Sequence, residues 1–205
     1  MKRVVLGLLT VLSVSQIVAQ NDLNRSSLQL NTITTAVPFL LIAPDSRAGA
    51  LGDAGVATSP DANSIHWNPA KMAFIDKEMG VSVSYSPWLR RLVPDISLSY
   101  LSLYKKLGDD HTIGGSLRYF SLGDINFTDE TGNALGDFRP AEFAVDIAYA
   151  RKLSDRFSGG IAARYIYSNL TGGIAANGSD TRAGTSFAVD VSGFYTNEDA
   201  ELFGQ

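Results

Sequence analysis

The chain has 205 residues, long enough for one domain with a sizeable core. Its formal net charge of −4 argues against a nucleic-acid-binding protein, which needs a basic patch or stripe. It contains no cysteine, which excludes disulfides, thiolate zinc sites, a cysteine nucleophile and a lipid-anchored N-terminal cysteine. Beyond the N-terminus there is no apolar run of about 18 residues, so no membrane-spanning helix is predicted.

The N-terminus has the order of regions that an export signal has. A basic start, Met1-Lys2-Arg3, precedes an apolar stretch from Val4 to Val14, and a polar shift follows with a plausible cleavage point at Ala19-Gln20. The alternative, a first strand or helix of the mature fold, would not need this order. We therefore expect residues 1–20 to be a signal peptide and the mature chain to leave the cytoplasm.

Six later segments alternate apolar and polar residues with a period of two, which predicts strands with one apolar and one polar face. They cover residues 80–88, 95–101, 111–120, 142–150, 158–167 and 186–195. The apolar set of the second segment is Ile96, Leu98 and Tyr100. Across the segments, the predicted apolar face includes Val83, Leu98, Val145 and Val189.

A soluble sandwich shows the same alternation, but three details favour a transmembrane antiparallel outer-membrane β-barrel. The segments are long for globular strands and suit tilted strands that cross a bilayer. Tyrosines lie near the segment ends, as an aromatic girdle requires: Tyr85, Tyr100, Tyr119, Tyr149, Tyr167 and Tyr195. The polar face carries charges of both signs in mid-strand, which a wet lumen accepts and a dry core does not: Arg118, Asp146, Arg164 and Asp190.

The connections between the segments differ in length. The short polar ones, 105–111, 152–156 and 197–201, suit the periplasmic side, and the longer ones, 121–140 and 169–184, suit the extracellular side. The first long connection carries an acidic set that could meet a basic partner or divalent cations: Asp124, Asp129, Glu130 and Asp137. The alternative is a plain solvated surface loop.

About six strands are readable, whereas bacterial single-chain barrels have at least about eight. An open sheet in lipid would leave edge groups unpaired. We therefore expect the chain to be the N-terminal portion of a longer barrel. The predicted organisation is a signal peptide (1–20), an N-terminal extension with a plug-like segment (21–78) and the first part of the barrel (79–205).

The stretch SRAGALGDAGVATSPDANSIHWNPAKMAF, residues 46–74, does not read as a site of chemistry. Gly49, Gly52 and Gly55 give G-x-x-G-x-x-G, whereas a dinucleotide loop needs G-x-G-x-x-G between a strand and a helix. The chain has two histidines, His66 and His111, and neither has the spacing of a metal site or a catalytic triad. We predict no catalytic, cofactor-binding or metal-binding residue, and a protein that is not an enzyme.

The same stretch reads better as architecture. Ser59 can cap a short helix that starts with Pro60, and Asn68 can cap another that starts with Pro69. The glycines permit tight turns and close backbone approach. His66 and Trp67 are then packing residues. A compact segment before the first strand suits an N-terminal plug.

These residues resemble a known signature. The stretch resembles the N-terminus of the FadL-type outer-membrane proteins, and residues 31–74 look like the PorV family of the Bacteroidota type IX secretion system. The residues that carry the plug-like motif are Arg47, Gly49, Gly52, Gly55, Asn68 and Pro69.

The resemblance implies a cell outer-membrane protein without a cofactor, surrounded by outer-membrane lipid. It also implies that the protein binds cargo with type IX C-terminal signal domains as the cargo leaves the SprA (Sov) translocon, and delivers it to the PorU-containing attachment complex. The alternative is a FadL-type transporter of long-chain fatty acids or other hydrophobic compounds, which needs an apolar pocket. The small, polar predicted lumen face favours the carrier, and the plug-like segment argues against a plain porin.

Overall fold

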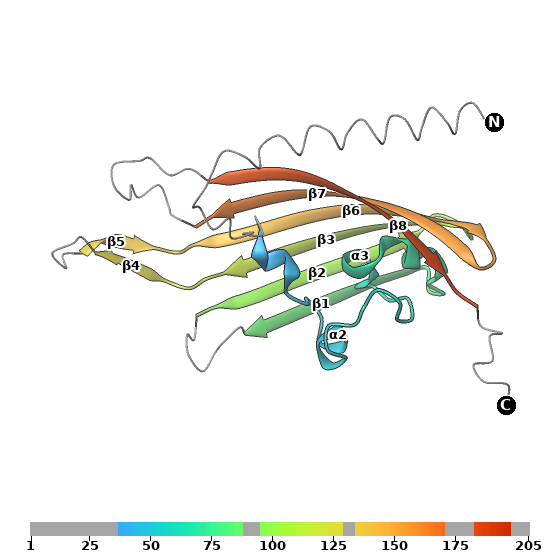
Figure 1. The fold of residues 1–205 in the computed structure, drawn as a ribbon, viewed down its shortest axis with the longest axis horizontal. Coiled ribbons are helices and arrows are strands. Elements are labelled where there is room, and N and C mark those ends of the chain that lie inside the picture. Colours follow the sequence, from blue (N-terminus) through green and yellow to red (C-terminus); the bar gives the residue numbers. More distant parts are fainter. Residues whose placement is uncertain (1–36, 88–94, 129–133, 171–182, 198–205) are drawn as a thin grey trace, which may run out of the picture. The chain divides into compact units, whose positions relative to one another are not determined.

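The computed structural model describes residues 37–87, 95–128, 134–170 and 183–197. Within these ranges, four short helices come first: η1 (Pro38–Leu41), α2 (Ser46–Ala50), α3 (Ser64–Trp67) and η2 (Pro69–Phe74). The strands follow: β1 (Met79–Pro87), β2 (Ser97–Lys106), β3 (His111–Ser121), β4 (Ile125–Thr128), β5 (Ala134–Phe138), β6 (Ala141–Ser154), β7 (Phe157–Asn169) and β8 (Gly184–Tyr195) (Figure 1). None of the helices in the described ranges is long and apolar enough to cross a membrane.

The main sheet has six strands in the order β1-β2-β3-β6-β7-β8, and every neighbouring pair is antiparallel. Each of the six segments predicted as strands overlaps one of these six strands, so the prediction of an all-β antiparallel fold is confirmed, although β2 runs five residues beyond its predicted end. Within the described residues β1 and β8 form the two edges of the sheet. The closed barrel stays a prediction. So does the signal peptide, because residues 1–20 lie outside the described ranges.

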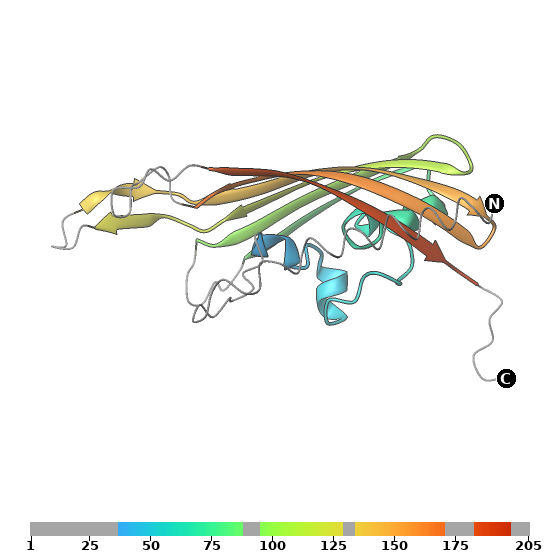
Figure 2. The same cartoon turned by 45° about the horizontal axis from the view of Figure 1, so that its top comes forward.

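The sheet has two unlike faces. Cross-strand partners share a face, so the row Ser84, Tyr100, Arg118, Ala144 belongs to what we call the inner face, and the row Val83, Leu101, Leu117, Val145 belongs to the outer face. All four short helices lie on the inner side of the sheet (Figure 2). The outer face exposes large apolar side chains, with Val83 at 76%, Ile147 at 70% and Phe187 at 81% exposure.

The second strand differs from its prediction. Leu98 and Tyr100 are each only 1% exposed and lie on the inner face, so the prediction that Leu98 belongs to the apolar outer face was wrong. Leu101 and Leu103 take the outer positions instead. The physical reason is that Phe39, from the N-terminal segment, forms a buried cluster with Leu98 and Phe120. Tyr100 is buried in a different cluster, with Ile65 and Met72, and is therefore not part of a girdle either.

The core lies between the N-terminal helices and the inner face. One buried cluster joins α3 and η2 to the sheet through Ile65, Met72, Ala73, Tyr104 and Ala148, among others. A second cluster joins η1 to the sheet and contains Phe39, Leu98, Phe120, Ala144 and Ile166. Burial of apolar surface is therefore the main force that holds residues 37–76 on the sheet.

The connection between β3 and β6 contains a hairpin that the sequence analysis did not identify. Strands β4 and β5 pair with each other in a separate two-stranded sheet, with a register shift between Phe127 and Thr128. At the base of the hairpin, Arg139 donates two hydrogen bonds to Asp124, at 2.7 and 2.8 Å. The predicted long connection thus contains regular secondary structure.

Candidate functional site: the N-terminal segment on the charged inner face

The Asn68-Pro69 pair turns the chain from α3 into η2. The Asn68 side-chain oxygen accepts a hydrogen bond from the Ala70 amide at 3.1 Å, and Pro69 occupies the first turn, so the predicted cap is confirmed. The Asn68 amide nitrogen donates to the Gly193 carbonyl at 3.1 Å. One side chain therefore both shapes the turn and joins it to β8.

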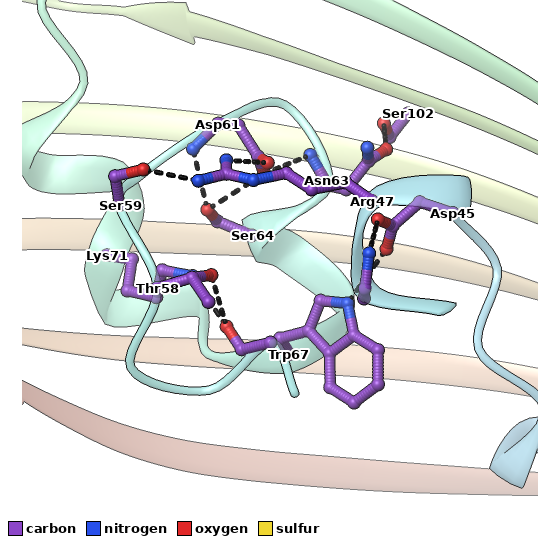
Figure 3. A network of polar contacts seen from close by, with 12 residues as sticks. Asp45, Arg47, Thr58, Ser59, Asp61, Asn63, Ser64, Trp67, Lys71 and Ser102 are labelled. Carbon is purple, nitrogen blue, oxygen red and sulfur yellow. Dashed lines mark hydrogen bonds and ion pairs between the residues drawn. The ribbon is translucent and has the colours of Figure 1, made fainter. Parts of the chain in front are cut away.

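The other predicted cap was wrong. Helix α3 begins at Ser64, and Ser59 instead accepts a hydrogen bond from Arg47. Asp61 lies nearer to the helix than Ser59 does, and its carboxylate accepts from the Asn63 amide at 2.9 Å, so it forms the turn before α3. Arg47 also forms an ion pair with Asp61 at 2.9 Å (Figure 3).

Three further contacts close the loop between α2 and α3. Asp45 caps α2 by accepting from the Ala48 amide at 2.8 Å, and its second oxygen accepts from the Trp67 indole at 2.9 Å. Lys71 is 1% exposed and donates to the Gly55 carbonyl at 2.7 Å (Figure 3). Burial lowers the pKa of the Lys71 ammonium, although the Asp61 carboxylate partly opposes this.

The three glycines of the motif have different roles. Gly52 has φ of +70°, a conformation that other residues rarely adopt. Gly55 is buried against the Trp67 ring, where a β-carbon would overlap the indole. A β-carbon at Gly49 would meet no atom within 4 Å. Shape therefore requires Gly52 and Gly55, whereas Gly49 has room for a side chain.

The backbone of Ala70 rests on strands β7 and β8. The Ser158 hydroxyl donates to the Ala70 carbonyl at 2.7 Å, and the Ser192 hydroxyl accepts from the Ala70 amide at 3.1 Å. A β-carbon at Gly160 would lie 2.6 Å from the Ala70 nitrogen, so glycine at this position permits the contact. On the other side of the segment, the Ser102 hydroxyl of β2 donates to Asn63 at 3.0 Å.

Arg118 connects both ends of the N-terminal segment to β3. Its guanidinium donates to the carbonyls of Phe39 at 3.2 Å and Leu40 at 2.9 Å, and to His66 Nδ1 at 2.7 Å. It also lies 5.5 Å from the centre of the Tyr100 ring. Because an arginine can only donate, His66 Nδ1 is the acceptor and the ring is neutral with its proton on Nε2.

Burial and, second, the Arg118 charge lower the pKa of His66 to about 3. The ring is therefore a weak base at neutral pH, and its Nδ1 is already occupied by Arg118. It packs edge-on against Trp67, with 4.7 Å between ring centres. This arrangement suits a packing residue and not a catalytic base.

All four charges that the sequence analysis placed on the polar face lie on the inner face. Arg164 forms an ion pair with Asp146, and a longer one with Asp190 at 3.7 Å, while the Ser116 hydroxyl donates to Asp146 at 2.6 Å. Arg118 and Asp146 are only 2% and 4% exposed. They are thus covered by the N-terminal segment and satisfied by protein partners, and not bathed in water as the wet-lumen argument assumed.

Several residues of this site were not identified from the sequence. Tyr100, Lys71, Ser158 and Ser192 all contact the N-terminal segment or its charged partners. The two serines could have been identified from the sequence, because they lie on the predicted polar face of their strands. Lys71 had no such signal, because its partners, the Gly55 carbonyl and the Thr58 hydroxyl, lie in a loop more than ten residues earlier in the chain.

The predicted acidic set is only partly described. Asp124 is paired with Arg139, which lowers the pKa of the Asp124 carboxyl, and Asp137 is exposed on β5. Asp129 and Glu130 lie outside the described residues. In the part of the chain that the structure describes, no group of three or more metal-ligating side chains comes together. Asp124 is therefore already paired within the chain.

The fold and this site define an all-β protein whose long antiparallel sheet holds its own N-terminal segment on a charged inner face. The model of one protein family, described as type IX secretion system protein PorV, matches residues 25–204. The chain belongs to this PorV family and is a type IX secretion system component. A comparison with functionally curated proteins gives no match.

Proposed function

We propose that the protein is an outer-membrane carrier of the type IX secretion system. In this proposal it binds cargo proteins that leave the SprA/Sov-type translocon and delivers them to the PorU-containing attachment complex at the cell surface. The observation that carries the proposal is the family match over residues 25–204. The carrier does no covalent chemistry, which agrees with a His66 that is held by Arg118 and has a pKa of about 3.

The two faces of the sheet support a place in the outer membrane. The outer face exposes Val83, Ile147, Phe187 and Val191, which lipid would cover. The proposed barrel would close by the pairing of further strands with the edges of β1 and β8, since open edges are not stable in lipid. The N-terminal segment on the inner face would then lie in the lumen and block it.

The β4–β5 hairpin is the proposed partner surface. It extends beyond the end of the main sheet at the side of the longer connections (Figure 1). Asp137 is exposed on it, while the Asp124–Arg139 pair holds its base. A hairpin fixed at its base presents its groups to a folded partner at a small entropic cost.

The alternative, a FadL-type transporter, needs an apolar pocket inside the barrel. Of the two apolar clusters on the described inner face, one is filled by Phe39 and the other by Ile65 and Met72, each of which is at most 1% exposed. Next to it lie Arg118, Asp146 and Arg164. The described part of the inner face therefore favours the carrier over the transporter.

The two functions separate in an affinity purification of the full-length protein from its native outer membrane. The carrier predicts co-purification of a very large β-barrel and of secreted proteins with type IX C-terminal signal domains. Bound lipid without protein partners would contradict the carrier and support the transporter.

Asp137→Lys tests the hairpin in the same experiment. Asp109→Lys is the matched control, because it reverses an exposed charge in the turn at the opposite end of the sheet. We expect the first variant, and not the second, to recover less of the partners. Equal recovery from both would remove the hairpin from the proposal.

A further inference from the structure

The outer face carries basic side chains at one end only among the described residues. His111 of β3 is directly opposite Arg151 of β6, and Lys105 of β2 is opposite Ile113, two residues from His111. All three side chains therefore project from the same face of three adjacent strands. Lys105 and Arg151 are exposed, and His111 is partly exposed.

Among the described residues, these basic side chains have no acidic partner on the face where they lie. In the described ranges, neither Lys105 nor Arg151 forms an ion pair with a carboxylate. The acids at this end lie outside the strands, in the turns (Asp109, Asp110 and Asp155) or just before β1 (Asp76 and Glu78). His111 Nδ1 is hydrogen-bonded to the Tyr149 hydroxyl at 2.5 Å, which fixes the ring beside Arg151.

An apolar surface begins directly next to the cations. Ile113 and Tyr149 are directly opposite each other on the outer face, two residues along their strands from His111 and Arg151. Leu103 and Ile147 continue the surface, at 47% and 70% exposure. At the other end of the sheet, the outer positions Ser97, Ser99 and Thr185 carry hydroxyls.

We propose that Lys105, His111 and Arg151 bind the phosphate of a glycerophospholipid whose acyl chains lie on Leu103, Ile113 and Ile147. The proposal rests on the proposed outer-membrane location and adds to it a headgroup site, at the end of the sheet with the short turns. Two cations without carboxylate partners match an anionic headgroup, and the adjoining apolar surface matches chains covalently attached to it. A free phosphate would make no use of that surface.

Native mass spectrometry of the full-length protein in detergent tests this site. Phosphatidylglycerol and diacylglycerol with the same chains are added separately, and glycerol phosphate is added as a competitor of phosphatidylglycerol. The test variant is Lys105→Gln with Arg151→Gln. The control, Lys77→Gln with Lys106→Gln, removes the same charge at the same end, and Lys106 belongs to the inner face because it is opposite the buried Thr112.

We expect the wild type and the control to retain phosphatidylglycerol and the test variant to retain it about tenfold less. Diacylglycerol should bind all three proteins equally weakly, and glycerol phosphate should not compete. The charge-preserving variant Lys105→Arg with Arg151→Lys should restore retention. Equal retention of phosphatidylglycerol by the test and control variants overturns the site, as does competition by glycerol phosphate.

These outcomes are distinct from a failure of the proposed function. A protein in the membrane that lacks this site would retain diacylglycerol as well as it retains phosphatidylglycerol. A protein whose outer face does not contact lipid would retain neither. Either result overturns the site, but only the second also contradicts the outer-membrane location.

Discussion

Arg118 is a buried cation that is satisfied mainly by carbonyls and an imidazole and not by a direct carboxylate partner. Its partners Phe39, Leu40 and His66 all belong to the N-terminal segment, so the charge stays satisfied only while that segment is in place. Loss of a partner from a buried charge typically costs several kcal/mol. The docking of the N-terminal segment on the sheet should therefore depend on whether each of these partners can still accept a hydrogen bond from Arg118.

His66 should make this docking sensitive to acid. Its pKa falls from 6.5 to about 3 in the folded protein, so the unfolded state binds more protons between these values. The contribution of neutral His66 is complete above pH 6.5 and is lost progressively as the pH falls towards 3. At pH 4.5 we expect a loss of roughly 1–3 kcal/mol.

The Trp67 fluorescence of a Trp88→Phe protein measures this loss, as the urea midpoint at pH 7 and pH 4.5. His66→Gln is the control, because a glutamine oxygen can accept from Arg118 without titrating. It should keep the pH 7 midpoint nearly unchanged and flatten the pH dependence. A loss of secretion by this variant at normal assembly levels would contradict the assignment of His66 as a packing residue.

Gly55 and Gly49 should respond in opposite ways to the same change. Gly55→Ala places a methyl group in the Trp67 ring, which Asp45 holds in position, and should cost about 1–3 kcal/mol of stability. Gly49→Ala adds a methyl group in open space within α2 and should stabilise by about 0.5–1 kcal/mol. Thermal melting in detergent compares them, and equal shifts would contradict the packing described for Trp67.

Adjacent glycines of β7 test the contact between η2 and the sheet. Gly160→Ala would push against the Ala70 backbone, which cannot move without breaking its bonds to Ser158 and Ser192. Gly159→Ala meets only the Leu153 side chain, at an ordinary 3.5 Å. We expect limited proteolysis to cut residues 37–76 several times faster in the first variant only. Similar rates in both variants would show that this contact does not hold the segment.

The alternation of apolar and polar residues predicted the strands well. It did not predict which residues cover each face of the sheet. The six strands of the main sheet follow from period two, because that pattern is local. The inward position of Leu98 depends on Phe39, which is distant in the sequence and has no local signal. The β4–β5 hairpin was missed because its strands have only 4 and 5 residues, too few for alternation to stand out.

The caps show the same division between local and distant information. Asn68 was predicted because its bond to the Ala70 amide spans two residues. Ser59 was misassigned because its partner, Arg47, comes from another helix. The four charges could be placed on the inner face because side chains alternate along each strand. The carbonyls that accept from Arg118 lie 79 and 78 residues away in the sequence and could not be foreseen.

At the scale of the whole molecule, Val83 and Ser84 compare the two faces of one strand. Val83 is 76% exposed on the outer face, and Val83→Arg should cost about 2–4 kcal/mol in a membrane. Ser84 belongs to the inner face and is partly exposed, so an arginine there would not point into lipid. We expect a lower folding yield in lipid vesicles for Val83→Arg than for Ser84→Arg. Equal yields would contradict a lipid-facing outer surface.

The contacts of Ala70 also bear on how the strands find their partners. A slip of β8 by two residues would keep its side chains on their faces but move Ser192 about 7 Å along the strand, away from the Ala70 amide. A slip of β7 would remove the bond of Ser158 in the same way. We therefore expect that the N-terminal segment forms its hydrogen bonds to β7 and β8 only when the two strands are correctly aligned, and we call these bonds the template contacts.

Cysteine trapping can detect such misalignment because the chain has no native cysteine. Ile161→Cys and Val191→Cys are directly opposite in the native alignment, so they should cross-link in the intact protein. Ile161→Cys with Val189→Cys should cross-link appreciably only once Ser158→Ala and Ser192→Ala remove the template contacts. If this second pair does not cross-link even then, the strands align without the N-terminal segment. If it does cross-link, the segment that fills the inner face also selects the correct strand alignment as the sheet assembles.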